Sequence, residues 1–331
     1  MGRHYRGYIG YGVTSSMYDY ANTLGGIITQ YDRNVTLAGS LLTTGGTLIP
    51  AASTPDGYDY HVFQTSGSLD ISGGSTNCDL MIIAGGGGGG GRLGGGGGAG
   101  GYLYLPNVPM SAGTHAVVIG AGGPALPVTY PNGPGANQQG SDTTLGSYKA
   151  WGGGGGSSDN GGTAMHGGSG GGGATNAGGP SKDGLNPTTP SPIITSDFPG
   201  ESHPYPYTQG YPGGSPGVPA GGGGAGGAGL AYATPCSSCG GPGKVGDIPV
   251  PASYGTPGPT PGRWFCGGGG GSGWSSYTNP SGGVGGGGSG GYPASGGDGT
   301  VNTGGGGGGG SITGGTSGAG GSGICVVRVL A

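Results

Sequence analysis

Charged residues are scarce in this chain of 331 residues: they make up 7% of it, and the net charge is only −4. A nucleic-acid-binding surface needs clustered lysine and arginine side chains, and the 9 such residues here are spread along the sequence. No apolar run approaches the length of a membrane span. We therefore expect no nucleic-acid partner and no membrane-spanning segment.

Catalytic groups are also few and scattered. The five histidines lie on separate segments, and the 13 acidic residues form no cluster, whereas a Ser-His-Asp triad or a carboxylate pair needs such groups close together. The glycine run 85–91 is followed by Arg92-Leu93 rather than by Gly-Lys-Ser/Thr, so it is not a phosphate-binding loop. We expect no enzyme, no catalytic residue and no cofactor.

The five cysteines are an odd number, so at least one has no partner within the chain. Cys78 and Cys325 stand at or in apolar runs and are expected to be small buried hydrophobes. Cys236 and Cys239 form a single CxxC motif, and no second pair of cysteines or histidines lies nearby to complete a zinc site. We expect a local disulfide or two free thiols there, and no metal.

Glycine is what the sequence has in excess, with 100 glycines beside 27 prolines. Without a strict Gly-X-Y period, this composition usually indicates disorder, because glycine loses much conformational freedom on folding and has no side chain to bury. Disordered chains, however, usually combine low hydrophobicity with high charge. Here the charge is low and apolar runs flank the glycines, so we predict a folded scaffold.

Strand patterns occur on both sides of the glycine region. Residues 67–71 alternate between apolar and small or polar side chains, and 79–84 form a continuous apolar run, as in a strand covered on both faces. We predict an all-β fold with essentially no α-helix. Its C-terminal strand completes a small β-sandwich, and the glycine region is a large insertion. The predicted strands lie near 57–84, 101–120, 147–151 and 324–330.

The glycine tracts between 85 and 323 are predicted to be polyglycine-II helices. Such a helix has three residues per turn and no internal hydrogen bonds, so its buried backbone groups must bond to neighbouring helices. An interior helix then needs glycine on every edge, whereas a peripheral helix accepts a small residue at every third position, as Ala225 and Ala228 or Ala319 and Ser322 suggest. We expect Gly→Ala to be tolerated at tract ends. The predicted glycine core, in runs 85–91 and 304–310, includes Gly85, Gly88, Gly91, Gly304, Gly307 and Gly310.

Proline and aromatic residues fill the segments between the tracts. Tyrosine and tryptophan offer large, stiff contact surfaces, and proline pre-orders a loop. Two interpretations stay open: these residues recognise a surface ligand such as a sugar, or they cap the edges of the glycine bundle. The candidate recognition residues are Tyr205, Tyr207, Tyr211, Trp274, Tyr277 and Tyr292.

The chain resembles the glycine-rich domain of virion proteins from cyanophage-like bacteriophages over about residues 57–331. The likeness rests on segments 60–63 and 80–84, on the run 85–91, and on 304–310 with the following 318–328. More distantly, the chain is similar to the glycine-rich tip adhesins of T-even-like phages, whose polyglycine-II core displays receptor-binding loops. Those adhesins lack the flanking sandwich.

The resemblance implies a structural component on the virion surface, such as a tail fibre or capsid appendage. Residues 1–50, whose composition differs and which lack the apolar core of a secretion signal, would be an arm attached to other virion proteins. Residues 51–331 would be the exposed domain, contacting a host-surface glycan or protein. A decoration protein without a receptor is the alternative, and the Tyr-Pro loops argue against an ice-binding protein. We expect synthesis in a host cytoplasm and a homo-oligomer, with a trimer favoured. The predicted attachment residues are Arg3, Tyr5, Arg6 and Tyr8.

Overall fold

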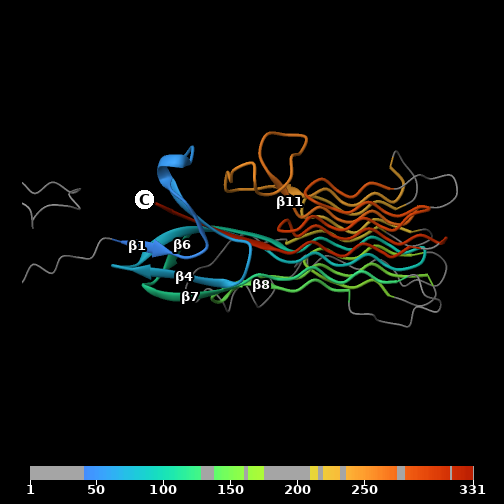
Figure 1. The fold of residues 1–331 in the computed structure, drawn as a ribbon, viewed down its shortest axis with the longest axis horizontal. Helices are drawn as coiled ribbons and strands as arrows, with labels where there is room; N and C mark the ends of the chain where they lie inside the picture. Colours follow the sequence, from blue (N-terminus) through green and yellow to red (C-terminus); the bar gives the residue numbers. More distant parts are fainter. Residues whose placement is uncertain are drawn as a thin grey trace, which may run out of the picture.

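A computed structural model describes residues 41–127, 138–159, 163–174, 209–214, 219–231, 236–273, 280–313 and 315–330. Strands gather at one end of an elongated molecule, and glycine-rich segments run side by side along the rest of its length (Figure 1). The only helical element in this part of the chain is one turn of 3-10 helix, Ala51–Ser53, and nothing described there could span a bilayer as a helix. The predicted all-β fold is confirmed.

Two antiparallel five-stranded sheets form the sandwich. One sheet has the order β2-β3-β12-β5-β6 and the other β1-β4-β7-β8-β9, while β10 and β11 pair separately. The strands are β1 (Leu42–Thr44), β2 (Thr47–Ile49), β3 (Tyr58–Phe63), β4 (Gly67–Ser72), β5 (Thr76–Ile83), β6 (Tyr102–Met110), β7 (Gly113–Val118), β8 (Thr143–Leu145), β9 (Tyr148–Ala150), β10 (Lys244–Val245), β11 (Trp264–Phe265) and β12 (Ile324–Leu330).

The C-terminal strand β12 occupies the middle of its sheet. Val326 pairs with Val62 of β3 on one side and with Met81 of β5 on the other. The sheet is therefore incomplete until the end of the chain is in place, and the prediction that this strand completes the sandwich is confirmed.

The sheet that contains β12 is covered on both faces. Leu80 and Val327 face the other sheet and pack among its buried residues, which include Leu69. The opposite face carries a second buried cluster, in which Phe265 covers Met81 and its neighbours. This arrangement accounts for the continuous apolar run at 79–84. The cover comes from the segment around β10 and β11, which Figure 1 shows beside the strands and which the sequence suggested was a loop.

The sandwich begins earlier than predicted. Thr43 pairs with Ile71, and Leu48 pairs with His61, so β1 and β2 are edge strands of the two sheets. The His61 ring is fully buried, and its two nitrogens contact the Gly45 carbonyl and the Thr43 hydroxyl. The boundary at residue 51 between arm and domain was placed too late, because three-residue strands leave little pattern in a sequence. The rest of the arm, including Arg3, Tyr5, Arg6 and Tyr8, lies outside the described residues.

Hydrogen bonds between the glycine segments repeat every third residue. Within 94–101, the amides of Gly94, Gly97 and Gly100 all donate to the segment 304–310. The two residues between each of these donate to other neighbours, so each edge of the helix bonds to a different segment. This is the repeat of a polyproline-II-type helix. The segment donates to 304–310, 151–157 and 220–223, and it accepts from 84–90, 169–172 and 269–272.

Segments in the interior of this glycine bundle are buried throughout, among them 85–91, 94–101, 267–273 and 304–310. The structure buries every glycine of the predicted core: Gly85, Gly88, Gly91, Gly304, Gly307 and Gly310. A Cβ on Gly88 would lie 2.1 Å from the carbonyl oxygen of Pro124, so there is no room for any side chain. The sequence did not show that the chain reverses at Arg92–Leu93 and that 94–101 is a separate interior helix.

Peripheral helices carry outward side chains three residues apart. Thr316, Ala319 and Ser322 are exposed or half-buried along one such helix. Ala225 and Ala228, which the sequence placed on another, instead lie at a reversal of the chain, where Gly224 bonds to Gly227 and Gly221 to Leu230. One exposed edge in three is what a helix with three residues per turn leaves free at the surface of a bundle.

Candidate recognition site

The two ends of the glycine bundle have different surroundings. At the near end, Ala84 and Gly101 bond to each other and lead directly into β5 and β6. Figure 1 shows the glycine segments running from the sheets to a far end on the opposite side. The chain turns back at Arg92–Leu93 at this far end, where the Gly90 amide donates to Gly95. The bundle therefore separates its far end from the sandwich by the length of its helices.

Several chain connections begin at the far end. The Asp159 amide donates to the Arg92 carbonyl, and the Arg92 guanidinium pairs with the Asp159 carboxylate at 2.6 Å. The Gly273 amide donates to Gly291, whose own amide donates to Gly309 beside the turn. The connections that follow residues 159, 273 and 291 therefore all leave from this end.

The predicted recognition residues are divided between locations. Tyr292 follows Gly291 at the far end and is half-buried. Tyr211 is 39% exposed, but it lies toward the near end. Its amide donates to the Gly224 carbonyl, and the adjacent Gly223 carbonyl accepts the Ala99 amide, close to the start of β6. The structure therefore does not bring these two tyrosines together. The other candidates, Tyr205, Tyr207, Trp274 and Tyr277, lie outside the described residues, although Trp274 directly follows Gly273 in the sequence.

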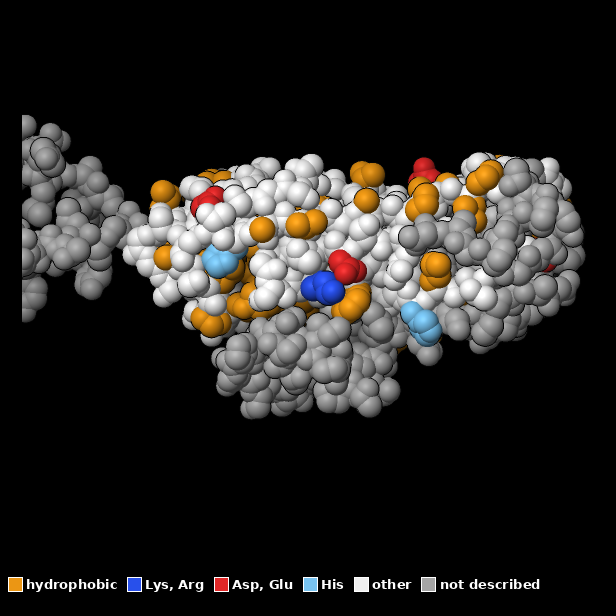
Figure 2. All heavy atoms as spheres, turned by 90° about the horizontal axis from the view of Figure 1, so that it is seen from below, with side chains coloured by type: hydrophobic (Ala, Val, Ile, Leu, Met, Phe, Trp, Pro, Cys, Tyr) orange, Lys and Arg blue, Asp and Glu red, His pale blue; other side chains and the backbone are white. Residues whose placement is uncertain are grey.

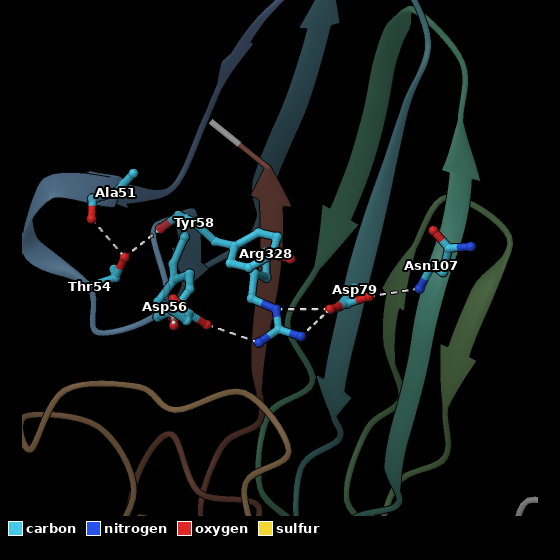
Figure 3. Close-up of polar contacts among 8 residues, drawn as sticks. Ala51, Thr54, Asp56, Tyr58, Asp79, Asn107 and Arg328 are labelled. Atoms are coloured by element: carbon cyan, nitrogen blue, oxygen red, sulfur yellow. Dashed lines mark hydrogen bonds and ion pairs between the residues drawn. The ribbon is translucent and has the colours of Figure 1, made fainter.

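Ionisable groups with shifted pKa values lie mainly in the sandwich. Arg328 of β12 pairs with Asp56 at 3.0 Å and with Asp79 of β5, and its guanidinium lies 4.8 Å from the centre of the Tyr58 ring (Figure 3). Burial raises the pKa of Asp56, but hydrogen bonds from Tyr60 and Arg328 outweigh it and hold that pKa below its ordinary value. The cluster ties the segment before β3 to the central strand, which is a structural role.

A second polar contact, missed from the sequence, fixes the covering segment. The Tyr102 hydroxyl donates to the Asp247 carboxylate at 2.8 Å and accepts the Asp247 amide at the same distance. Lys244 also pairs with Asp247 and lies over the Tyr102 ring. Burial and the adjacent Asp247 raise the pKa of Tyr102 well above its ordinary value, so it remains a neutral donor. The contact anchors the cover at the base of the bundle.

The cysteines fall into two groups. Cys78, Cys266 and Cys325 are free and buried, and burial raises the pKa of the Cys78 and Cys325 thiols to about 12. Cys236 and Cys239 are joined by a disulfide at the far end, where the Gly271 amide donates to the carbonyl of Ser238, one of the two residues between them. Of the two outcomes expected from the CxxC motif, the structure has the disulfide.

Metal-ligating side chains are not clustered in the part of the chain that the structure describes. No group of three or more His, Cys, Asp and Glu residues there could hold a metal ion. On the face drawn in Figure 2, hydrophobic side chains are scattered and charged ones are few. Single exposed apolar residues are ordinary on protein surfaces. What distinguishes the molecule is the bundle and the connections at its far end.

A family model described as a glycine-rich domain matches residues 63–330. Because the match covers most of the chain, the protein belongs to this family. It spans the sandwich from the end of β3 to β12 together with the whole glycine bundle. No curated protein matches the chain at a significant level.

Proposed function

We propose that this member of the glycine-rich domain family is a non-enzymatic structural protein of a bacteriophage virion. It is exposed as a fibre or appendage, and connections at the far end of its bundle contact a host-surface glycan or protein. The observation that carries the proposal is that the connections after residues 159, 273 and 291 leave together from the end remote from the sandwich. Binding residues commonly sit on loops that a rigid scaffold positions.

The bonding of the bundle supports such a role. Its helices are held by backbone hydrogen bonds between glycines, so the lattice does not depend on the sequence of the connections. Connections can therefore differ in length and composition without changing the scaffold. A surface that must match varied receptors needs this independence.

The opposite end of the sandwich supports the attachment role. Leu41, Leu42 and Leu48 are 41%, 56% and 51% exposed, and they lie where the predicted arm meets β1 and β2. Three exposed leucines within a short stretch of sequence, on or next to the edge strands of both sheets, favour contact with another protein. Attachment at this end leaves the far end of the bundle free to reach outward.

The test uses the full chain, fluorescently labelled, with bacterial cells and a glycan array. We expect Trp274→Ser with Tyr277→Ser, in the connection after residue 273, to weaken binding at least tenfold, on the order of the loss of an aromatic anchor. Tyr205→Ser with Tyr207→Ser lies outside the connections after residues 159, 273 and 291 and should weaken binding less. The control is Val301→Ser, a residue 69% exposed at the near end, which should bind as the unmodified protein does. Unchanged binding by both double variants would refute the receptor role and favour a decoration protein.

A further inference from the structure

The disulfide between Cys236 and Cys239 closes a turn whose carbonyl groups accept hydrogen bonds from neighbouring segments of the glycine bundle. Ser238 within the turn has a φ of 65°, a left-handed conformation that is uncommon for a residue with a side chain. The carbonyls of this turn complete the bonding of two neighbouring segments: Ser238 accepts the Gly271 amide at 2.8 Å, and Cys239 accepts the Leu230 amide at 2.9 Å. Relaxing the turn would therefore release hydrogen bonds in both neighbours.

The sulfur atoms also touch a third segment. The Ser281 hydroxyl lies 3.1 Å from the Cys239 sulfur and 3.7 Å from the Cys236 sulfur, and the Ser281 carbonyl accepts the Gly240 amide. Ser281 stands at the start of 280–284, which follows the connection containing Trp274 and Tyr277 in the sequence. The disulfide thus lies beside Ser281, two residues after the end of a connection proposed for recognition.

Only this cysteine pair is placed to react with small thiols. Cys236 is half-buried, whereas Cys78, Cys266 and Cys325 are at most 1% exposed. Thiol–disulfide exchange requires access to a sulfur atom by the attacking thiolate. A mild reductant should therefore open the disulfide and leave the buried thiols unchanged.

We propose that the Cys236–Cys239 disulfide is a redox-controlled lock on the far end of the bundle, open in a reducing medium and closed after release into an oxidising one. The co-reactant is a low-molecular-weight disulfide. The thiolate of Cys236 attacks one of its sulfurs and expels a thiolate; the Cys239 thiolate then attacks the mixed disulfide at Cys236 and expels the second. Both expelled thiolates take up the protons lost by the cysteines. The pair is oxidised by two electrons, and the small disulfide is reduced to two thiols.

The experiment follows chymotrypsin cleavage after Leu230, which is 42% exposed and bonded to Cys239. It compares the oxidised protein, the dithiothreitol-reduced protein and a Cys236→Ser/Cys239→Ser variant. We expect cleavage on the order of tenfold faster in the reduced protein and in the variant, because the short closed loop no longer restrains local opening. The variant should not respond to reductant. Cleavage after Leu48, in the sandwich, should be equal in all three.

Alkylation after unfolding provides a second measurement. The oxidised protein should expose three alkylatable thiols, matching the three free cysteines. Five alkylatable thiols, or equal cleavage after Leu230 with and without reductant, would overturn the proposal. The lock serves the proposed recognition role, but neither measurement involves a host cell. Loss of the receptor role would therefore leave a redox-dependent far end intact, and the two failures can be distinguished.

Discussion

A Cβ placed on Gly306 would lie 2.0 Å from the carbonyl oxygen of Gly97. Both residues belong to interior helices of the glycine bundle, and their backbones are bonded to further neighbours on other edges. Neither helix can move away from the other without breaking its hydrogen bonds to those further neighbours. Glycine is required at Gly306 because two backbones touch there, and not because of an unusual φ angle.

Gly306→Ala is therefore expected to destabilise the fold strongly. Overpacking a well-packed interior usually costs about 1–3 kcal/mol, and a clash with fixed backbone belongs at or above the top of that range. The matched control is Gly227→Ala, whose Cβ would meet only ring carbons of Pro242 at 3.1 and 3.2 Å. Its loss should stay below about 1 kcal/mol. Thermal unfolding of both variants checks the difference, and similar melting temperatures would contradict it.

Gly→Ala is not better tolerated at the end of a glycine tract than in its middle. Gly85 begins a tract, yet its Cβ would lie 2.0 Å from the carbonyl oxygen of Ala121, and Gly304 begins another with a φ of +68°. The expectation that Gly→Ala is tolerated at tract ends is wrong at these positions, because neighbours approach them as closely as they approach the middle. We expect Gly85→Ala to lower the melting temperature about as much as Gly306→Ala, and a near-normal melting temperature would show that the near end can yield.

The sequence predicted the individual strands and glycine helices better than it predicted which of them pack against one another. The apolar runs at 79–84 and 324–330 predict buried strands, and the uninterrupted glycines of 85–91 and 304–310 predict helices without a free edge. The pairing of 94–101 with 304–310 could not be predicted, because all glycine helices have the same edges. A short apolar segment such as 264–266 likewise carries no sign that it covers a distant sheet.

The ion pairs of Arg328 should matter more than exposed ones. Its side chain is 18% exposed and faces two carboxylates, those of Asp56 and Asp79. Arg328→Met would leave both acids without their cation in a half-buried site, so we expect a loss of about 2 kcal/mol in the free energy of unfolding. Lys149→Met is the comparison, since Lys149 and Asp142 lie 3.4 Å apart in more exposed positions. Denaturant unfolding should show less than about 1 kcal/mol there.

Acid should weaken the same site. The pKa of Asp56 is held below its ordinary value of 3.8 in the folded protein, since its hydrogen bonds outweigh burial. Its contribution to stability is therefore fully present above the pKa of the unfolded chain and is lost as the pH falls through the lower folded value. We expect the melting temperature of the unmodified protein to fall more steeply below about pH 4 than that of Asp56→Asn. Parallel curves would exclude Asp56 as a source of the acid sensitivity.

The cover over the second face of the sheet should be essential to the fold. Phe265 is fully buried and packs in the cluster with Met81, Ile83 and Val326. Phe265→Ala would leave a cavity against the central strands and is expected to cost about 3–5 kcal/mol. The control Val301→Ala removes an exposed side chain and should change stability by less than about 0.5 kcal/mol. If the cover instead detaches as a unit, a dye that binds apolar surface should bind Phe265→Ala at temperatures where the glycine bundle still resists proteolysis. Unchanged stability together with no dye binding would show that the sheet does not depend on this cover.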